Sequence, residues 1–151
     1  MADSIAEKIL ANIKTTLEAI TTAAGYNNTV QIVYRDPIAA LDLQKYPAIF
    51  IAVGSDDTDP MAKSSAHRSL NLTLEIWIRP QKDLSKSLES IRADVQKAMM
   101  VDVHRGANAV NTIERSSSYM LIMGEIPEGA IQIGYTMEYR TKIEDPFSAP
   151  A

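Results

Sequence analysis

The residues that could perform chemistry are few and scattered along the chain. Its two histidines are His67 and His104, it has no cysteine, and none of its serines stands in a G-x-S-x-G sequence. A serine nucleophile needs a neighbouring base, and cysteine thiolates supply many structural zinc sites. Both histidines lie in polar, loop-like sequence, where a solvated imidazole is the simpler interpretation. The sequence excludes disulfides and argues against catalysis, so we expect no catalytic residue, no metal and no cofactor.

The densest acidic cluster consists of Asp56, Asp57 and Asp59. A calcium-binding loop of the EF-hand type needs a glycine at its sixth position and a glutamate at its twelfth, and neither is present when the count starts at Asp56 or Asp57. Two interpretations remain, a solvated loop and a negatively charged rim on an assembly. The polar stretch from Gly54 to His67 is long for a connector, so we expect a functional or mobile loop there.

Trp77 and Arg79 lie on the polar side of an expected strand and could stack on a nucleotide base or anchor another protein. Base-stacking platforms combine several aromatic residues with a basic surface. This chain has one tryptophan and a net charge of −4, from 15 basic and 19 acidic residues. A protein interface is therefore favoured, comprising Thr73, Glu75, Trp77 and Arg79 on one face of the strand.

Two segments carry the apolar spacing of amphipathic helices. The first begins after Ser4, which forms a capping box with Glu7, and is expected to run to Gly25. The second follows Asp83, as its N-cap, and ends before Gly106. The apolar residues that recur every three or four positions are Ile5, Ile9, Ile13, Leu17 and Ile20 in the first and Leu84, Leu88, Ile91, Val95 and Met99 in the second. Each helix must therefore bury one face.

Several segments carry the pattern of β-strands. Residues 69–79 alternate strictly between apolar and polar side chains, which predicts one face on the core. Residues 48–53 are apolar throughout, which is typical of an inner strand buried on both faces. The full set of expected strands is residues 29–35, 48–53, 69–79, 111–114, 119–123 and 130–139.

Strands that occur in runs between helices favour an α+β fold. We expect a mostly antiparallel sheet of four to six strands with two main helices packed on one face. With 151 residues, 46% of them hydrophobic, the chain has the size of one domain, which we assign to residues 1–143, followed by a flexible C-terminal tail at 144–151. The longest apolar run, Tyr46 to Val53, is about a third of the length that a bilayer crossing requires, so no membrane association is expected.

Four strand-like segments and the helix after Asp83 follow an order that resembles the tail terminator proteins of long-tailed bacteriophages. These are the lambda-like minor tail protein family and its relatives from contractile tails. The segments are VQIVY at 30–34, YPAIFI at 46–51, LNLTLEIWI at 70–78 and GYTMEYR at 134–140. The resemblance covers nearly the whole chain. It consists of the order of the helices and strands and the spacing of their apolar residues, and it includes no catalytic motif.

This resemblance implies a structural virion protein without enzymatic activity, assembled in the host cytoplasm. It implies a hexameric ring that caps the finished tail tube, stops its polymerisation and provides a docking surface for the head or neck, while genomic DNA passes through the lumen without specific binding. The implied partners are other copies of the chain, the tube protein, neck or connector proteins, and the sheath if the tail is contractile. Asp56, Asp57 and Asp59 would then lie in a loop that lines the lumen or contacts the tube.

Two alternatives remain open. A head-tail connector or neck completion protein would share parts of the same layout. From a different class, a small single-stranded nucleic-acid-binding domain would use the face that carries Trp77. It would lose affinity steeply as the salt concentration rises.

Overall fold

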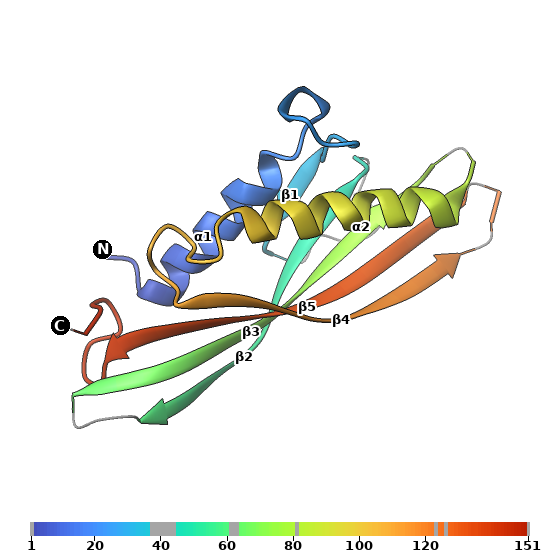
Figure 1. Cartoon of the computed structure of the whole chain (residues 1–151). Coiled ribbons are helices and arrows are strands. Elements are labelled where there is room, and N and C mark those ends of the chain that lie inside the picture. The colour runs from blue at the N-terminus through green and yellow to red at the C-terminus, as the bar shows by residue number, and fades with distance from the viewer. Residues whose placement is uncertain are drawn as a thin grey trace.

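The computed structural model describes residues 2–36, 45–60, 64–80, 82–122, 124–125 and 127–150. Two helices lie on one face of a five-stranded sheet with the strand order β1-β2-β3-β5-β4 (Figure 1). β1 pairs with β2 in parallel, and every other pairing is antiparallel. The elements in chain order are α1 (Ile5–Glu18), the 3-10 turn η1 (Thr22–Ala24), β1 (Ile32–Tyr34), β2 (Ala48–Pro60), β3 (Ser65–Ile78), α2 (Leu84–Val101), β4 (Asn111–Ile122) and β5 (Glu128–Lys142). The expected α+β fold is confirmed.

The core lies between the helices and the face of the sheet that they cover. The alternation predicted for β3 is confirmed, because its side chains from Leu70 to Ile78 are buried at every second position. β5 contributes the matching row: Ile131, Ile133, Tyr135, Met137 and Tyr139. The helices contribute Ile5, Ile9, Leu10, Ile13 and Leu17 from α1 and Leu88, Ile91, Val95, Ala98 and Met99 from α2. Since these apolar faces are complementary, burying them stabilises the two-layer arrangement.

α1 is shorter than the sequence suggests. The Ser4 side chain caps it as expected, accepting a hydrogen bond from the Glu7 backbone N–H at 3.1 Å, but the Glu7 carboxylate pairs with Arg35 instead of completing the capping box. The helix stops at Glu18, and Thr21 caps the short η1 turn that follows. Gly25 closes this turn in the left-handed conformation with φ 93°, so it ends the helical region without belonging to α1.

The predicted loop from Gly54 to His67 is wrong, because β2 and β3 continue through most of it as a hairpin. Their pairing runs from Ala48 opposite Trp77 to Pro60 opposite Ala66, interrupted by a register shift between Val53 and Ser55. We call Asp56–Pro60 and Ser65–Ser69 the arm (Figure 1, green). Polar residues occupy the arm because solvent reaches much of its surface. Its two strands are held together by backbone pairing and do not need alternating apolar side chains. Residues 61–63 lie outside the described part of the chain.

The prediction that residues 48–53 are buried on both faces is also wrong. Ile49 and Ile51 are buried against the helices, whereas Phe50 and Ala52 are only partly buried and Val53 is half exposed. Phe50 and Ala52 are only partly buried because the helices cover only one face of β2. Val53 lies on the same face as Ile49 and Ile51, opposite Leu72, and is the last residue before the register shift. The two expected strands around residues 116–118 form the single strand β4, with an irregular register between Glu114 and Ser117.

The last residues of the chain run back along the end of the sheet. The Lys142 backbone N–H donates to the Ser148 carbonyl oxygen at 3.0 Å, and the Ile5 N–H donates to the Pro146 carbonyl oxygen at 3.0 Å. The flexible tail at 144–151 and the domain boundary at residue 143 remain predictions. In the described residues, no helix is long and apolar enough to cross a membrane.

Candidate assembly surface

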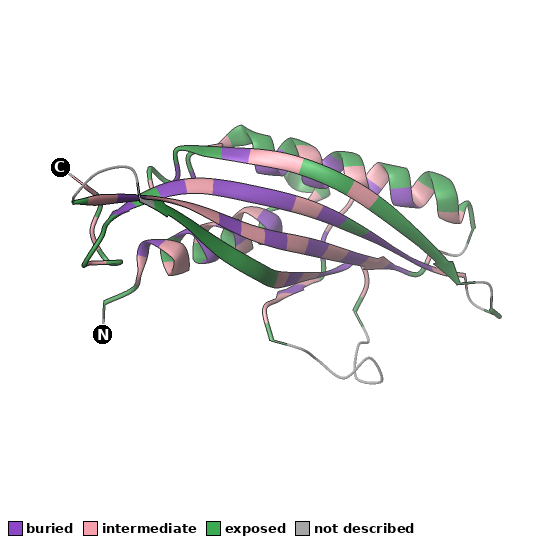
Figure 2. Cartoon of the chain, turned by 90° about the horizontal axis from the view of Figure 1, so that it is seen from below, coloured by how far each residue is buried: buried purple, intermediate pink, exposed green. Residues whose placement is uncertain are grey.

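The face of the sheet that points away from α1 and α2, which we call the outer face, is the most extensive surface left without a helical cover (Figure 2). The side chains on it follow directly from the strand register. In β3 they are His67, Ser69, Asn71, Thr73, Glu75, Trp77 and Arg79, and in β5 they are Glu128, Ala130, Gln132, Gly134, Thr136, Glu138 and Arg140. Charged residues lie at both ends of this face, near the arm and around Arg79 and Glu128, and small polar residues occupy the middle.

All four residues of the predicted interface lie on this outer face. Thr73, Glu75 and Trp77 are partly buried, and Arg79 is exposed. The Trp77 indole N–H donates to the Glu75 carboxylate. Because its polar atom is held by its own strand, Trp77 lies as a fixed element of the surface, which is the pre-organisation that a protein interface favours.

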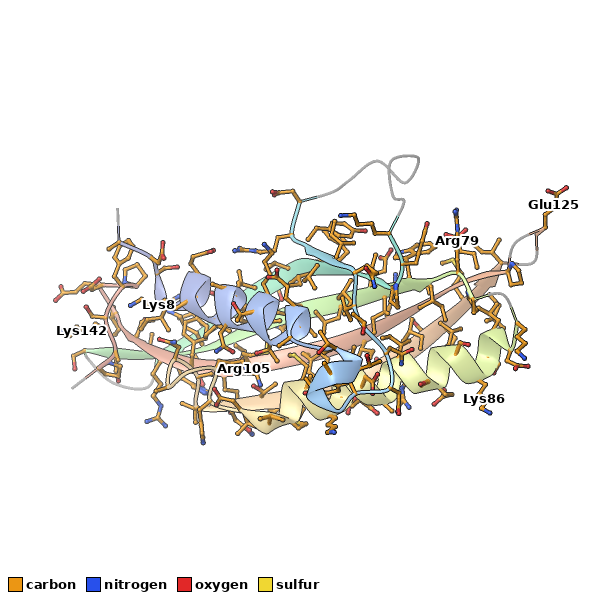
Figure 3. The ribbon with its side chains drawn as sticks, turned by 90° about the horizontal axis from the view of Figure 1, so that it is seen from above. Lys8, Arg79, Lys86, Arg105, Glu125 and Lys142 are labelled. Atoms are coloured by element: carbon orange, nitrogen blue, oxygen red, sulfur yellow. The ribbon has the colours of Figure 1, made fainter. Side chains whose placement is uncertain are left out.

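Arg79 is held by two neighbours at the end of the sheet that leads to Glu125 (Figure 3). Its guanidinium lies 4.7 Å from the centre of the Tyr46 ring and 3.4 Å from the Glu128 carboxylate. Burial and the Glu128 charge raise the pKa of Tyr46. The cluster fixes the position of an exposed cation.

A shallow hollow of about 220 Å³ occupies the middle of the outer face. It forms where Gly54 and Gly134 leave the backbone uncovered and Arg115 lies above them. The Arg115 Nε donates to Thr136 at 3.2 Å, and Thr136 donates to Asn71 at 2.7 Å. The hollow offers hydrogen-bonding groups and one cation, but no nucleophile with a neighbouring base.

The three aspartates do not form one cluster. Asp57 and Asp59 lie opposite Ser69 and His67, on the outer face, whereas Asp56 lies opposite Leu70, on the face that the helices share. This division is the ordinary alternation of side chains along a strand, and the register shift between Val53 and Ser55 decides which face each aspartate takes. Asp56 accepts a hydrogen bond from the Tyr139 hydroxyl, and burial together with this carboxylate raises the pKa of Tyr139.

The two histidines lie on separate parts of the chain. His67 pairs with Asp59 and Arg140 in the strand register, and His104 is exposed in the turn after α2. The His104 backbone N–H donates to Asp102, whose pKa is lowered mainly by the Gly106 N–H. Within the described part of the chain, no three His, Asp or Glu side chains are grouped so that they could hold a metal ion.

One notable feature escapes the sequence analysis. Tyr119, Met120, Leu121 and Ile122, at the end of β4, are 48%, 48%, 54% and 40% exposed. The sequence predicts only an ordinary strand here, because an apolar run is typical of a buried strand. The missing information is that β4 is the outermost strand of the sheet.

The scan against family models decides the class of the protein. Residues 2–125 match the family described as Bacteriophage Tail Tube Terminator Protein. The chain belongs to this family. The match confirms the resemblance found in the sequence, and it makes this tail terminator a structural protein of the bacteriophage virion, which assembles with other tail or virion proteins. The family is not normally enzymatic.

Similarity to solved structures and to curated proteins is limited for this tail terminator. A chain of a solved structure described as "Virion of native gene transfer agent (GTA) particle" is 11% identical and aligns over 87% of this chain and 93% of its own length, with a TM-score of 0.46. No curated protein matches the chain. The roles of Thr73, Glu75, Trp77 and Arg79 and of the three aspartates remain predictions.

Proposed function

We propose that this tail terminator forms a closed hexameric ring that caps the finished tail tube and stops its polymerisation. The ring also presents the docking surface for the head or neck, and the genomic DNA passes through its lumen. The observation that carries the proposal is the family match over residues 2–125. It is supported by an outer face that has no helical cover and on which the Trp77 side chain is held in place, since such a surface suits binding by shape.

The outer face supplies the contacts with neighbouring proteins in this proposal. Thr73, Glu75, Trp77 and Arg79 form its central strip, and the indole and guanidinium groups are the types that contribute most to interface affinity. Neighbouring copies or the tube protein would cover this strip. A variant in which Trp77 is replaced by alanine is expected to fold, because the side chain is only partly buried, and to cap tubes less effectively.

The arm supplies negative charge to the lumen or to the contact with the tube. Asp57 and Asp59 point to the outer face, and no cation lies within salt-bridge distance of either among the described residues. A chain with a net charge of −4 suits a channel that repels phosphates, because basic residues would hold the DNA by releasing its counterions. In the assembled particle, Asp57→Lys with Asp59→Lys would slow DNA passage if the arm lines the lumen, and would weaken capping if it contacts the tube.

Tube growth in the presence of the protein tests the proposal. Polymerising tube protein is mixed with increasing amounts of the terminator, and tube lengths are measured by negative-stain electron microscopy. We expect growth to stop and a ring to appear at one end of each tube. Mass photometry, on the protein alone and after release from tubes, should show one closed oligomer.

Continued growth at saturating terminator would contradict the proposal. Co-sedimentation distinguishes it from the neck alternative, since a neck completion protein would pellet with portal or connector rings and not with tubes. A steep loss of DNA affinity between about 50 and 200 mM salt would instead favour a nucleic-acid-binding domain.

A further inference from the structure

We propose that β1 of one copy pairs with the end of β4, Ser118–Ile122, of the next copy, so that the sheets of neighbouring subunits join edge to edge. The inference rests on the proposed function, because it names the contact between copies in the ring. The two strands are the outermost strands of the sheet order β1-β2-β3-β5-β4. In the described part of the chain, β1 pairs only with β2 and β4 only with β5.

The end of β4 is an unprotected edge. Its last four residues are all apolar and 40–54% exposed, and the segment 118–122 contains no charge and no proline. Its register with β5 is regular there, because the irregularity lies between Glu114 and Ser117. Soluble proteins normally protect such edges with charges, prolines or bulges, since an unpaired regular edge recruits another strand. An edge left without these devices is therefore expected to be covered in the assembled protein.

The other long edge of the sheet carries the protection that this segment lacks. Beyond the end of β1, the outer edge of β2 runs through the arm, where Asp56, Asp57 and Asp59 add charge. The register shift between Val53 and Ser55 also distorts this edge. The contrast indicates that the arm is kept from pairing with strands, and it leaves β1 as the uncharged edge on that side of the sheet.

The two uncharged edges lie at the same level of the sheet. Following the pairing across the strands, Ile32 lies opposite Ala48, which lies opposite Trp77, then Ala130 and finally Met120. The next outer-face row runs from Tyr34 through Phe50, Glu75 and Gln132 to Ser118. A rotation that continues these rows from one copy into the next keeps each residue at its level. It would therefore bring Ile32 of one copy opposite Met120 of the next.

The strand directions also agree. β1 runs parallel to β2, and three successive antiparallel pairings separate β2 from β4, so β1 and β4 are antiparallel. The same rotation preserves these directions and gives an antiparallel junction, as in most of the sheet. The facing pairs would be Ile32 with Met120, Val33 with Tyr119 and Tyr34 with Ser118, all uncharged. Because the two surfaces differ, such contacts repeat head to tail instead of forming a two-fold dimer, and they close into a ring where the rotation between copies allows it.

Engineered disulfides test the junction directly, since the chain has no cysteine of its own. The variant with Ile32→Cys and Met120→Cys is oxidised as assembled rings, in solution or on tubes, and separated on a non-reducing denaturing gel. Residues directly opposite in antiparallel strands have Cα atoms about 4.5–5.5 Å apart, within the range of a disulfide. We expect a ladder of linked copies up to the size of the ring. Each single-cysteine variant should give no ladder, and neither should Met120→Cys combined with Ser55→Cys, which lies on β2 beyond the end of β1.

A charge placed on the edge gives a second readout that does not depend on disulfide geometry. Met120→Lys with Leu121→Lys should reduce closed oligomers and tube-bound copies roughly tenfold or more, because like charges and unpaired ammonium groups oppose strand addition. Both side chains are about half exposed, so the thermal unfolding of the subunit should change little. The matched control is Val101→Lys, at an apolar residue that is 76% exposed at the end of α2, and it should leave assembly unchanged.

The outcomes separate this inference from the proposed function. Rings that form without the 32–120 crosslink, or that still form with both lysines, overturn the junction and leave the ring standing. A linked pair from the Met120→Cys variant alone, with particles of two copies, overturns it in favour of a β4-to-β4 dimer. A wild-type chain that forms no closed oligomer in solution or on tubes overturns both proposals.

Discussion

Replacing Asp94 with asparagine should destabilise the subunit far more than the same change elsewhere on α2. Asp94 is 3% exposed, and its carboxylate accepts three hydrogen bonds from the turn that follows η1. One oxygen accepts from the Asn27 backbone N–H at 3.1 Å, and the other accepts from the Asn28 backbone N–H and side-chain amide, both at 2.8 Å. These contacts bind the turn after the first helical region to α2.

The magnitude follows from the geometry of the amide. The side chain introduced by Asp94→Asn would keep one acceptor oxygen, which can retain the two bonds from Asn28, but its NH₂ group would face the Asn27 N–H, a donor against a donor. Hydrogen bonds to a charged acceptor contribute about 1.5–3 kcal/mol and neutral ones about 0.5–1.5 kcal/mol. Losing one bond and weakening two therefore costs about 2–4 kcal/mol. For a chain of this length that corresponds to a fall in Tm of about 5–15 °C.

Urea unfolding measures the effect, with circular dichroism and the fluorescence of Trp77, the single tryptophan, as independent probes. The matched control is Asp83→Asn, because Asp83 stands at the N-cap of α2 but its side chain makes no capping hydrogen bond. Asparagine also tolerates its left-handed conformation, φ 55°, so this variant should stay within about 0.5 kcal/mol of wild type. The reasoning fails if Asp94→Asn is as stable as Asp83→Asn.

Three further substitutions probe separate features of the subunit. Arg35 lowers the pKa of Glu7 from its ordinary value of 4.5, chiefly by hydrogen bonding, so the pair stabilises the protein at neutral pH and loses this effect as the pH falls below 4.5. The substitution Glu7→Gln should therefore lower the free energy of unfolding by about 0.5–1 kcal/mol at pH 7. In acid, the urea midpoint of this variant should converge with that of the wild type. Arg105, which Figure 3 labels, is wholly buried and donates a hydrogen bond to the Met99 carbonyl oxygen near the end of α2. The substitution Arg105→Ala should lower the free energy of unfolding in urea by about 2–5 kcal/mol. A loss below about 1 kcal/mol would show that this buried contact does not stabilise the subunit. Gly25→Ala meets no atom within 4 Å but must adopt φ 93°, so a loss of about 1–2 kcal/mol should appear in thermal unfolding, and an unchanged Tm would show that the turn relaxes.

The fold could be predicted where the spacing of apolar residues in the sequence matches the side chains that are buried in the structure. The strict alternation of β3 and the repeated apolar positions of α2 predicted elements whose buried faces are confirmed. The same reasoning failed at the arm, because Asp56–Pro60 carries no apolar alternation. Its strand structure depends on backbone pairing with β3, and β3 is supported in turn by β5. An apolar pattern in the sequence predicts which side chains are buried. It does not predict a strand that is stabilised only by backbone pairing with its neighbour.

The candidate site was predicted less completely for a related reason. Trp77 and Arg79 could be found because their residue types stand out on the polar side of a strand. Tyr119–Ile122 escaped notice because an apolar run predicts burial wherever it occurs, and only the strand order shows that this run lies at an edge. Likewise, the sequence groups Asp57 and Asp59 with Asp56, although side chains alternate along β2 and place Asp56 on the opposite face.

The distribution of charge over the two edges links the fold to the proposed assembly. A sheet that is to be joined repeatedly must leave one segment of each edge free to pair, and it must prevent pairing elsewhere, since slipped or extended contacts would produce open filaments instead of a closed ring. In this chain the aspartates and the register shift distinguish the arm from β1, and the irregular stretch between Glu114 and Ser117 separates the first half of β4 from its apolar end. The uncharged segments that remain are short and level with each other. Their position brings Ile32 level with Met120, and we expect disruption of this proposed register to affect ring closure before it affects the stability of the subunit.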